Sequence, residues 1–254
     1  MYKHVLILIS FLIICNTAVI ATPSSLNEII PIKTFAKGQA VSAERMGIES
    51  VYSNPAGLTA IDGITYSASY SSFYENLYSS MGLSIGTKLD ENIYLGISAP
   101  VKLITDIPET VEVNGVGAQI GSFSDIETAG IITLAMKLNQ NINIGMNTSY
   151  YYHKIYNETA SGLSLDLGVI ADYGQISVGA SIQNIGNSDL TWSTGLTEKQ
   201  KQRISIGTMV EISKAITLLG DAVYEKDNIM YNLGGELKFS SNLSIPFGIN
   251  DISG

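Results

Sequence analysis

The sequence predicts an all-β protein, a transmembrane antiparallel β-barrel preceded by a segment without strand character. Three observations carry this prediction: few charged residues, long segments of alternating apolar and polar residues, and connections that alternate between short and long. Charged residues make up 15% and hydrophobic residues 45% of the 254 residues, whereas soluble domains carry about 25% charged residues. A surface so poor in charge suits contact with lipid, and the length fits one large barrel domain.

Residues 1–21 have the features of a secretory signal peptide. His4 lies in a charged start, the run from Val5 to Ile14 is apolar, and small residues ending at Ala21 form a cleavage pattern. Cys15, the only cysteine, leaves with the signal; the alternative, lipidation, is disfavoured by the bulky Ile14 before it. The mature chain then has no disulfide. Because no later segment reaches the roughly 18 apolar residues of a membrane helix, membrane residence depends on strands.

Residues 22–62 form the second expected unit, a plug or hatch segment. Its motif is Asn54, Pro55, Ala56, Gly57 and Leu58. Asn54 can cap a helix, Pro55 suits a first turn because its missing N–H is not needed there, and Gly57 permits close backbone approach. In a barrel whose N-terminus faces the periplasm, such a turn can fold into the lumen before the first strand.

Residues 63–254 are expected to form the barrel. Around Leu167, apolar residues fall on one face while Asp166 and its neighbours fall on the other, and Ile170 is the exception. Such alternation predicts strands near residues 63–70, 78–89, 92–103, 126–139, 141–153, 161–173, 175–185, 202–213, 215–224, 229–239 and 242–250. A soluble β-sandwich also alternates, but several of these strands reach the roughly 9 to 11 residues that cross a bilayer.

The connections favour the barrel over the sandwich. Short turns follow every second strand, whereas longer connections are expected at residues 71–77, 104–125, 154–160, 186–201 and 225–228. Outer-membrane barrels have short periplasmic turns and longer external loops. The predicted location is therefore the outer membrane of a bacterial cell, with the N-terminus in the periplasm.

Polar residues on the strands predict a water-facing wall and no chemistry. The expected lumen-facing polar residues are Asp166, Asp172, Asp221 and Glu236, and polarity of the wall explains them better than an acid pair does. The chain has two histidines: His4 lies in the signal, so His153 has no second imidazole for a metal pair. We expect no catalytic residue, no cofactor and no metal. The net charge of −9, without a basic stripe, excludes a nucleic-acid partner.

Three stretches together resemble a known family. The stretch AKGQAVSAERMGIESVYSNPAGLTAI at residues 36–61 is similar to the N-terminal signature of the PorV/PorQ family and of the related FadL-type long-chain fatty-acid transporters. ASIQNIG at residues 180–186 and LLGDAVYEKDNIMYNLGGELKFSSNLSIPFGIN at residues 218–250 match the PorV-like pattern. The resemblance implies a fourteen-stranded FadL/PorV-like barrel with an N-terminal plug. Because about eleven strands are present and the chain ends at Gly254 without a terminal aromatic residue, C-terminal truncation is expected.

Three functions fit these observations. The later stretches favour a PorV/PorQ-like outer-membrane protein, a secretion-linked surface component whose partners are exported proteins. The alternatives are FadL-type transport of hydrophobic small molecules and a structural or antigenic surface protein. The Asn-Pro-Ala-Gly turn does not choose between the first two, since relatives of both types share it. All three place the protein in contact with outer-membrane lipid.

Overall fold

The computed structural model describes residues 31–113, 115–186, 189–225, 227–240 and 243–252. The expected signal peptide, with His4 and Cys15, lies outside the described residues. The described chain is one antiparallel sheet of 13 strands and three short helices. No helix in this part of the chain is long and apolar enough to cross a bilayer.

The strands follow one another around the sheet in the order of the sequence. They are β1 (Ile64–Phe73), β2 (Tyr78–Lys88), β3 (Ile93–Val113), β4 (Val116–Lys137), β5 (Ile142–Ile155), β6 (Glu158–Tyr173), β7 (Ile176–Gln183), β8 (Asp189–Trp192), β9 (Thr197–Lys199), β10 (Arg203–Ser213), β11 (Ile216–Glu225), β12 (Asn228–Ser240) and β13 (Leu243–Ile249). The path runs from β1 to β7 and on from β10 to β13, while β8 pairs with β6 and β9. Among the described residues no pairing joins β1 to β13, so the sheet does not close.

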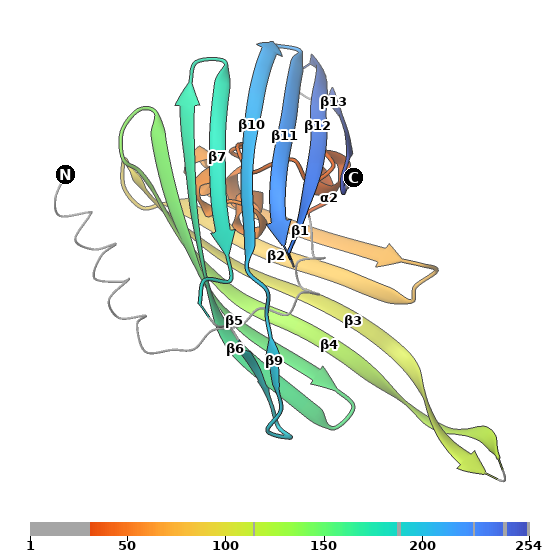
Figure 1. The fold of residues 1–254 in the computed structure, drawn as a ribbon. Coiled ribbons are helices and arrows are strands. Elements are labelled where there is room, and N and C mark those ends of the chain that lie inside the picture. The colour runs from red at the N-terminus through yellow and green to blue at the C-terminus, as the bar shows by residue number, and fades with distance from the viewer. Residues whose placement is uncertain (1–30, 114, 187–188, 226, 241–242, 253–254) are drawn as a thin grey trace.

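The prediction of a loop at residues 104–125 is wrong. β3 continues to Val113 and β4 starts at Val116, so these residues form a long hairpin that projects from the sheet (Figure 1). The turn contains Gly115 with a φ of 77°, which glycine adopts without steric cost. Similarly, β5 ends at Ile155 and β6 starts at Glu158, where a longer loop is expected. At this end of the sheet, strands therefore occupy most of the residues expected to be loops, and the turns between these strands are short.

Eleven strands are predicted and each has a counterpart, but the structure adds two. β8 and β9 lie within residues 186–201, which are expected to be a loop. β8 pairs with β6 through Ala160 and Trp192, beyond the point where β7 ends. These short strands therefore extend the sheet past the end of β7, alongside the first residues of β6.

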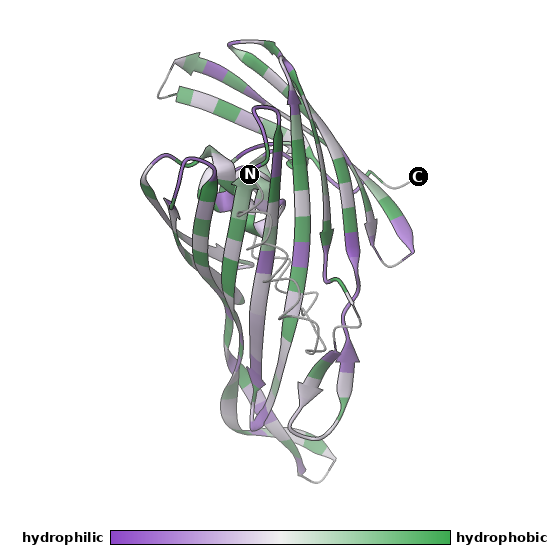
Figure 2. Cartoon of the chain, turned by 90° about the vertical axis from the view of Figure 1, so that its left-hand side faces the viewer, coloured by the Kyte–Doolittle hydropathy of each residue, from purple (hydrophilic) through white to green (hydrophobic). Residues whose placement is uncertain are grey.

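The sheet has two chemically different faces. Along the strands, hydrophobic and hydrophilic residues alternate in bands (Figure 2). On β6, the side chain of Asp166 is buried on the concave face, whereas Val169 is exposed on the opposite face. Ile170, which breaks the sequence alternation, is fully buried on the concave face. The prediction that Leu167 and Asp166 face opposite ways agrees with the strand pairing.

The segment before the first strand lies inside the curl of the sheet (Figure 1). It contains the helix α2 (Ile32–Ala36) and the 3-10 helices η2 (Gly47–Tyr52) and η3 (Pro55–Ala60). η3 contacts β3 to β6, η2 contacts β1 to β3, and α2 contacts β13. We call residues 32–61 the N-terminal segment. It touches strands near both ends of the open sheet.

Apolar side chains fill the space between the N-terminal segment and the wall. One buried cluster joins the segment to β3 and β4 through Ile48, Val51, Leu58, Ile61, Tyr94 and Ala135. A second cluster lies on β4, β5, β6 and β8 and contains Ala129, Ile131, Tyr151, Ala160 and Leu190. Tyr52 packs against both clusters. Burial of these side chains is the main apolar stabilisation of the segment's position.

Candidate functional site

The candidate site is the contact between the N-terminal segment and the concave face, and the Asn-Pro-Ala-Gly-Leu turn lies at its centre. Asn54 caps η3: its Oδ1 accepts a hydrogen bond from the N–H of Ala56 at 3.1 Å, and Pro55 occupies the first helical position. This is the local structure expected from the sequence. Asn54 to Thr59 are all buried.

Asn54 also joins the turn to the wall. Its Nδ2 lies 2.7 Å from the carbonyl oxygen of Ser42, 3.1 Å from that of Val169 on β6 and 3.3 Å from that of Ala180 on β7. The side-chain amide thus caps a helix with its oxygen and binds two strands with its nitrogen. Aspartate could accept the capping bond but could not donate, so the amide is the group that this position needs.

Glycines on the wall allow the backbone of the segment to come this close. A Cβ atom on any of five strand glycines would overlap backbone or side-chain atoms of the N-terminal segment: Gly145, Gly168, Gly179, Gly234 and Gly248. Gly145 and Gly168 are register partners on β5 and β6, and Gly234 and Gly248 are partners on β12 and β13. The glycines therefore form three shallow places in the wall: one under the Pro55 turn, one under residues 37–38, and one at Gly179 under residues 42–43. We call these five residues the glycine seat.

Gly57 serves a similar purpose within the segment. A Cβ atom there would overlap the side chain of Ser50, which itself accepts a hydrogen bond from the N–H of Met46 at 3.0 Å. The close backbone approach expected at Gly57 is thus present, although it is made to η2 and not to a strand.

Three of the four wall carboxylates expected from the sequence bind the N-terminal segment directly. Oδ2 of Asp221 accepts hydrogen bonds from the N–H and the hydroxyl of Ser42, at 2.9 and 2.7 Å. Glu236 lies 3.2 Å from Nζ of Lys37, which also pairs with Glu44 at 2.6 Å. The third is Asp172, 3.4 Å from Nε of Arg45.

The fourth carboxylate, Asp166, acts through a neighbour. Its Oδ2 accepts from Nδ2 of Asn147 at 3.0 Å, and the same nitrogen lies 2.9 Å from the carbonyl oxygen of Val51. Oδ1 of Asn147 accepts from Thr133 at 2.7 Å, while the N–H of Asn184 donates to Oδ1 of Asp166 at 3.0 Å. A buried chain of hydrogen bonds thus runs across β4, β5 and β6 to the segment.

Tyr52 joins η2 to β2 by a polar contact, in addition to its packing against both apolar clusters. Its hydroxyl and that of Ser84 are 3.1 Å apart. Burial raises the pKa of Tyr52, with a smaller opposite effect from its hydrogen bond to Ser84. The phenol therefore stays neutral and can donate or accept at ordinary pH.

The sequence predicts the wall carboxylates but not their partners. Lys37, Ser42, Arg45 and Asn147 carry no local pattern that marks them, because each is defined by a residue far away in the chain. Among residues near one another in space, the described chain holds one group that could bind a metal, Asp125, Glu127 and His153. It lies outside this site.

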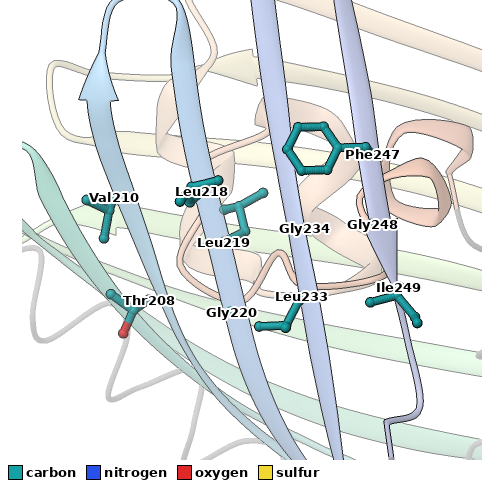
Figure 3. A pocket seen from close by; sticks show the side chains of 10 residues that line it. All are labelled: Thr208, Val210, Leu218, Leu219, Gly220, Leu233, Gly234, Phe247, Gly248 and Ile249. Carbon is teal, nitrogen blue, oxygen red and sulfur yellow. The ribbon is translucent and has the colours of Figure 1, made fainter.

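An apolar groove of about 640 Å3 lies on the convex face of the sheet and is formed by β10 to β13 (Figure 3). Two neighbouring rows of outward-facing residues line it: Thr208, Gly220, Leu233 and Ile249 in one, and Val210, Leu218 and Phe247 in the next. Gly234 and Gly248 belong to its lining and also lie against residues 37–38 on the other face. One layer of backbone therefore separates the groove from the N-terminal segment.

Comparison with known proteins places the fold. No protein-family model and no curated protein matches the sequence. The structure is similar to a deltaS2S3 mutant of the monoaromatic hydrocarbon channel TodX, with a TM-score of 0.64, 12% identity and coverage of 85% of this chain and 81% of that chain. For the toluene transporter TodX of Pseudomonas putida the TM-score is 0.54, with 13% identity over 85% and 91% of the two chains.

A third similar structure is the monoaromatic hydrocarbon channel CymD, with a TM-score of 0.52, 11% identity and coverage of 87% and 92%. At these identities the likeness shows the fold alone. The chain has the antiparallel β-architecture of these channels, and nothing in the comparisons singles out the PorV/PorQ family.

Proposed function

We propose that this protein is an outer-membrane β-barrel of the FadL type that passes hydrophobic small molecules, with the N-terminal segment as its plug. The observation that carries the proposal is the position of residues 32–61 inside the curl of the sheet, bound to β6, β7 and β11 to β13. The fold likeness to hydrocarbon channels supports transport, which the sequence offers as an alternative, over the secretion-linked role.

The proposal assigns a part to each segment of the chain. Residues 1–21 direct export, residues 22–62 form the plug, and residues 63–254 form the wall. The apolar, exposed side chains on the convex face, such as Leu233 and Ile249, face lipid, and the carboxylates of the concave face line the lumen. The sequence resemblance of residues 36–61 to FadL-type transporters supports the same arrangement.

The chemistry of the contact suits a plug that is held and released. Glu236, Asp172 and Asp221 bind the segment through ion pairs and hydrogen bonds, which water can replace one at a time when the segment moves. The glycine seat lets the segment approach without interlocking side chains. The apolar cluster that joins Ile48, Val51 and Leu58 to the wall is the part of the contact that opposes release, because its side chains would have to be exposed to water when the segment moves.

Uptake measurements on cells test the proposal. The full chain is expressed in a Gram-negative host that lacks its own channel for hydrophobic compounds, and initial uptake of radiolabelled toluene and oleate is measured. We expect uptake of at least one compound above the level of cells with an empty vector. If neither rises although the protein is recovered in the outer membrane, transport is wrong and the secretion-linked role gains.

A reversible lock tests the role of the segment. Ser42→Cys with Asp221→Cys replaces a contact of 2.7 Å by a disulfide between segment and wall, in a chain whose expected mature form has no other cysteine. Uptake should fall when the disulfide forms and return on reduction. Each single cysteine variant is the matched control. Uptake that does not respond to the disulfide would mean that the segment is not a moving plug.

A further inference from the structure

A second polar group lies on the concave face, apart from the contacts of the N-terminal segment. Glu127 on β4 and His153 on β5 are direct register partners, and Asp125 lies two residues before Glu127 on the same face. Nε2 of His153 is 2.7 Å from Oδ1 of Asp125. One ligand atom from each of the three side chains can be chosen so that all lie within 4.8 Å of one another.

The three side chains are held in a mostly dry environment. Their exposed fractions are 14% for His153, 15% for Asp125 and 6% for Glu127. The ring of Trp192 on β8 packs against the imidazole, with centroids 5.0 Å apart. Tyr151, two residues before His153 on the same face, belongs to the apolar cluster with Ala129 and Leu190. The contact with Trp192 restricts the rotation of the imidazole and shields one side of it from water.

We propose that Asp125, Glu127 and His153 form a binding site for a divalent transition-metal ion of the zinc class. One imidazole nitrogen and two carboxylate oxygens are a ligand set that Zn2+ accepts, at about 2.0 to 2.2 Å, with the remaining position open to water or to a fourth ligand. The short contact between His153 and Asp125 marks the place where the ion replaces the shared proton. The sequence predicts no metal because His153 has no second imidazole to pair with; the sheet register instead places two carboxylates beside it.

The surrounding charge favours a cation. Asp125 and Glu127 contribute two negative charges, and Glu198 on β9 accepts a hydrogen bond from Nε1 of Trp192 at 3.3 Å. Against these stands Lys102 on β3, whose Nζ is 3.7 Å from Oε1 of Glu127. In the described part of the chain, the carboxylates of Asp125 and Glu127, with Glu198 nearby, outnumber the ammonium group of Lys102, and a divalent ion reduces this excess of negative charge.

Lys102 supplies a diagnostic for the site. It competes with a metal for Glu127, and its ammonium group also lies 5.3 Å from the centre of the Tyr78 ring. Removing its charge should therefore strengthen metal binding. If the three residues serve only as an ion pair between neighbouring strands, the same change should destabilise the protein and leave its metal affinity unaltered.

Zinc binding to the purified full chain tests the proposal. The protein is isolated in detergent through a tag without histidine, stripped with EDTA and titrated with Zn2+ by calorimetry; Co2+ absorption then reports on the ligands. We expect one ion per chain. His153→Gln and Asp125→Asn should each weaken Zn2+ binding by about tenfold or more, because even the loss of a residue that only hydrogen-bonds a metal ligand costs about tenfold. Lys102→Gln should strengthen Zn2+ binding.

A matched control and a second readout keep the result interpretable. Glu211→Gln removes an exposed carboxylate on β10 and should leave Zn2+ binding unchanged. Zn2+ should also raise the unfolding temperature of the wild-type protein and not that of His153→Gln, provided that both show heat-modifiable migration on gels. Absence of stoichiometric Zn2+ binding, or equal binding by wild type and His153→Gln, would overturn the proposal.

Discussion

Replacing Asp221 by asparagine should release the N-terminal segment from the wall more often without disturbing the wall itself. Asparagine has the shape of aspartate and keeps one oxygen to accept from Ser42. It removes the negative charge that now receives two hydrogen bonds, from the N–H and the hydroxyl of Ser42. The other oxygen of Asp221, Oδ1, is buried without a hydrogen-bond partner among the described residues, so the new amide group finds no acceptor there.

The size of the effect follows from these two bonds. A hydrogen bond to a charged group contributes about 1.5 to 3 kcal/mol, and a neutral one about 0.5 to 1.5 kcal/mol. Losing the charge at Asp221 should therefore weaken the seated state by about 2 to 3 kcal/mol over both bonds. Since Asp221 is 6% exposed, solvent screening reduces this little. At 1.4 kcal/mol for each factor of ten, the fraction of released segment should rise about 30- to 150-fold.

Cysteine labelling measures that fraction. Ala43, next to Ser42, is 1% exposed, and Ala43→Cys gives a single thiol in the expected mature chain. Its labelling by a membrane-impermeant maleimide should depend on release of the segment and should accelerate in the same proportion when Asp221→Asn is added. Glu211→Gln, an exposed carboxylate on the neighbouring strand, is the control. A labelling rate within twofold of the parent would refute the idea that Asp221 holds the segment.

The remaining predictions address the faces of the wall, the glycine seat and the segment as a whole. Leu167→Arg should destabilise the inserted protein by about 2 to 4 kcal/mol if the residue lies near mid-bilayer, as measured by urea unfolding with Leu167→Met as the control; an unaltered midpoint would place this face away from lipid. Gly179→Leu should overlap the backbone at Ser42 and accelerate labelling of Ala43→Cys, and unchanged labelling would contradict the seat. Deletion of residues 36–58 removes no strand, so the protein should still insert and should conduct ions better in planar bilayers; equal conductance would make the segment a docking element.

Strand alternation predicts the faces of the sheet because a period of two depends only on local geometry. Asp166 and Leu167 fall on the sides that the sequence indicates. Ile170 breaks the pattern for a reason that lies outside its strand: the N-terminal segment covers this part of the concave face, and an apolar side chain is buried there. The alternation therefore predicts which face of the sheet a residue lies on, but not where the N-terminal segment covers that face.

The long hairpin of β3 and β4 was predictable in part. Pro108 and several glycines favour a loop at residues 104–125, but the sequence Val113-Asn114-Gly115-Val116 is a strong hairpin signal. The strands tolerate the irregular residues by shifting register between Ile104 and Ile107, and again between Glu109 and Thr110. Bulges of this kind preserve pairing beyond a residue that would otherwise end the strand. The Asn-Gly pair in the sequence is the local signal for this hairpin, whereas no local signal marks the bulges.

The partners of the wall carboxylates could not be found from sequence. The helix cap at Asn54 is local and was predicted, whereas the same residue's bond to Val169 joins positions 115 apart. Ser42 and Asp221 are 179 positions apart. Such pairs form only because the curvature of the sheet brings distant strands close to the segment. Neither a periodicity nor a short motif in the sequence predicts that curvature.

These separations also set an order of assembly. Each strand of the continuous path pairs with its sequence neighbour on that path, so hairpins can form one after another at small loop-closure cost. The pair of Lys37 and Glu236 spans 199 positions and exists only when β12 is in place. The N-terminal segment is synthesised before the strands that bind it, so part of its binding surface is missing until β11 to β13 are in place. Until those strands are in place, the groups that the segment buries in the folded protein must be satisfied by water or by another partner.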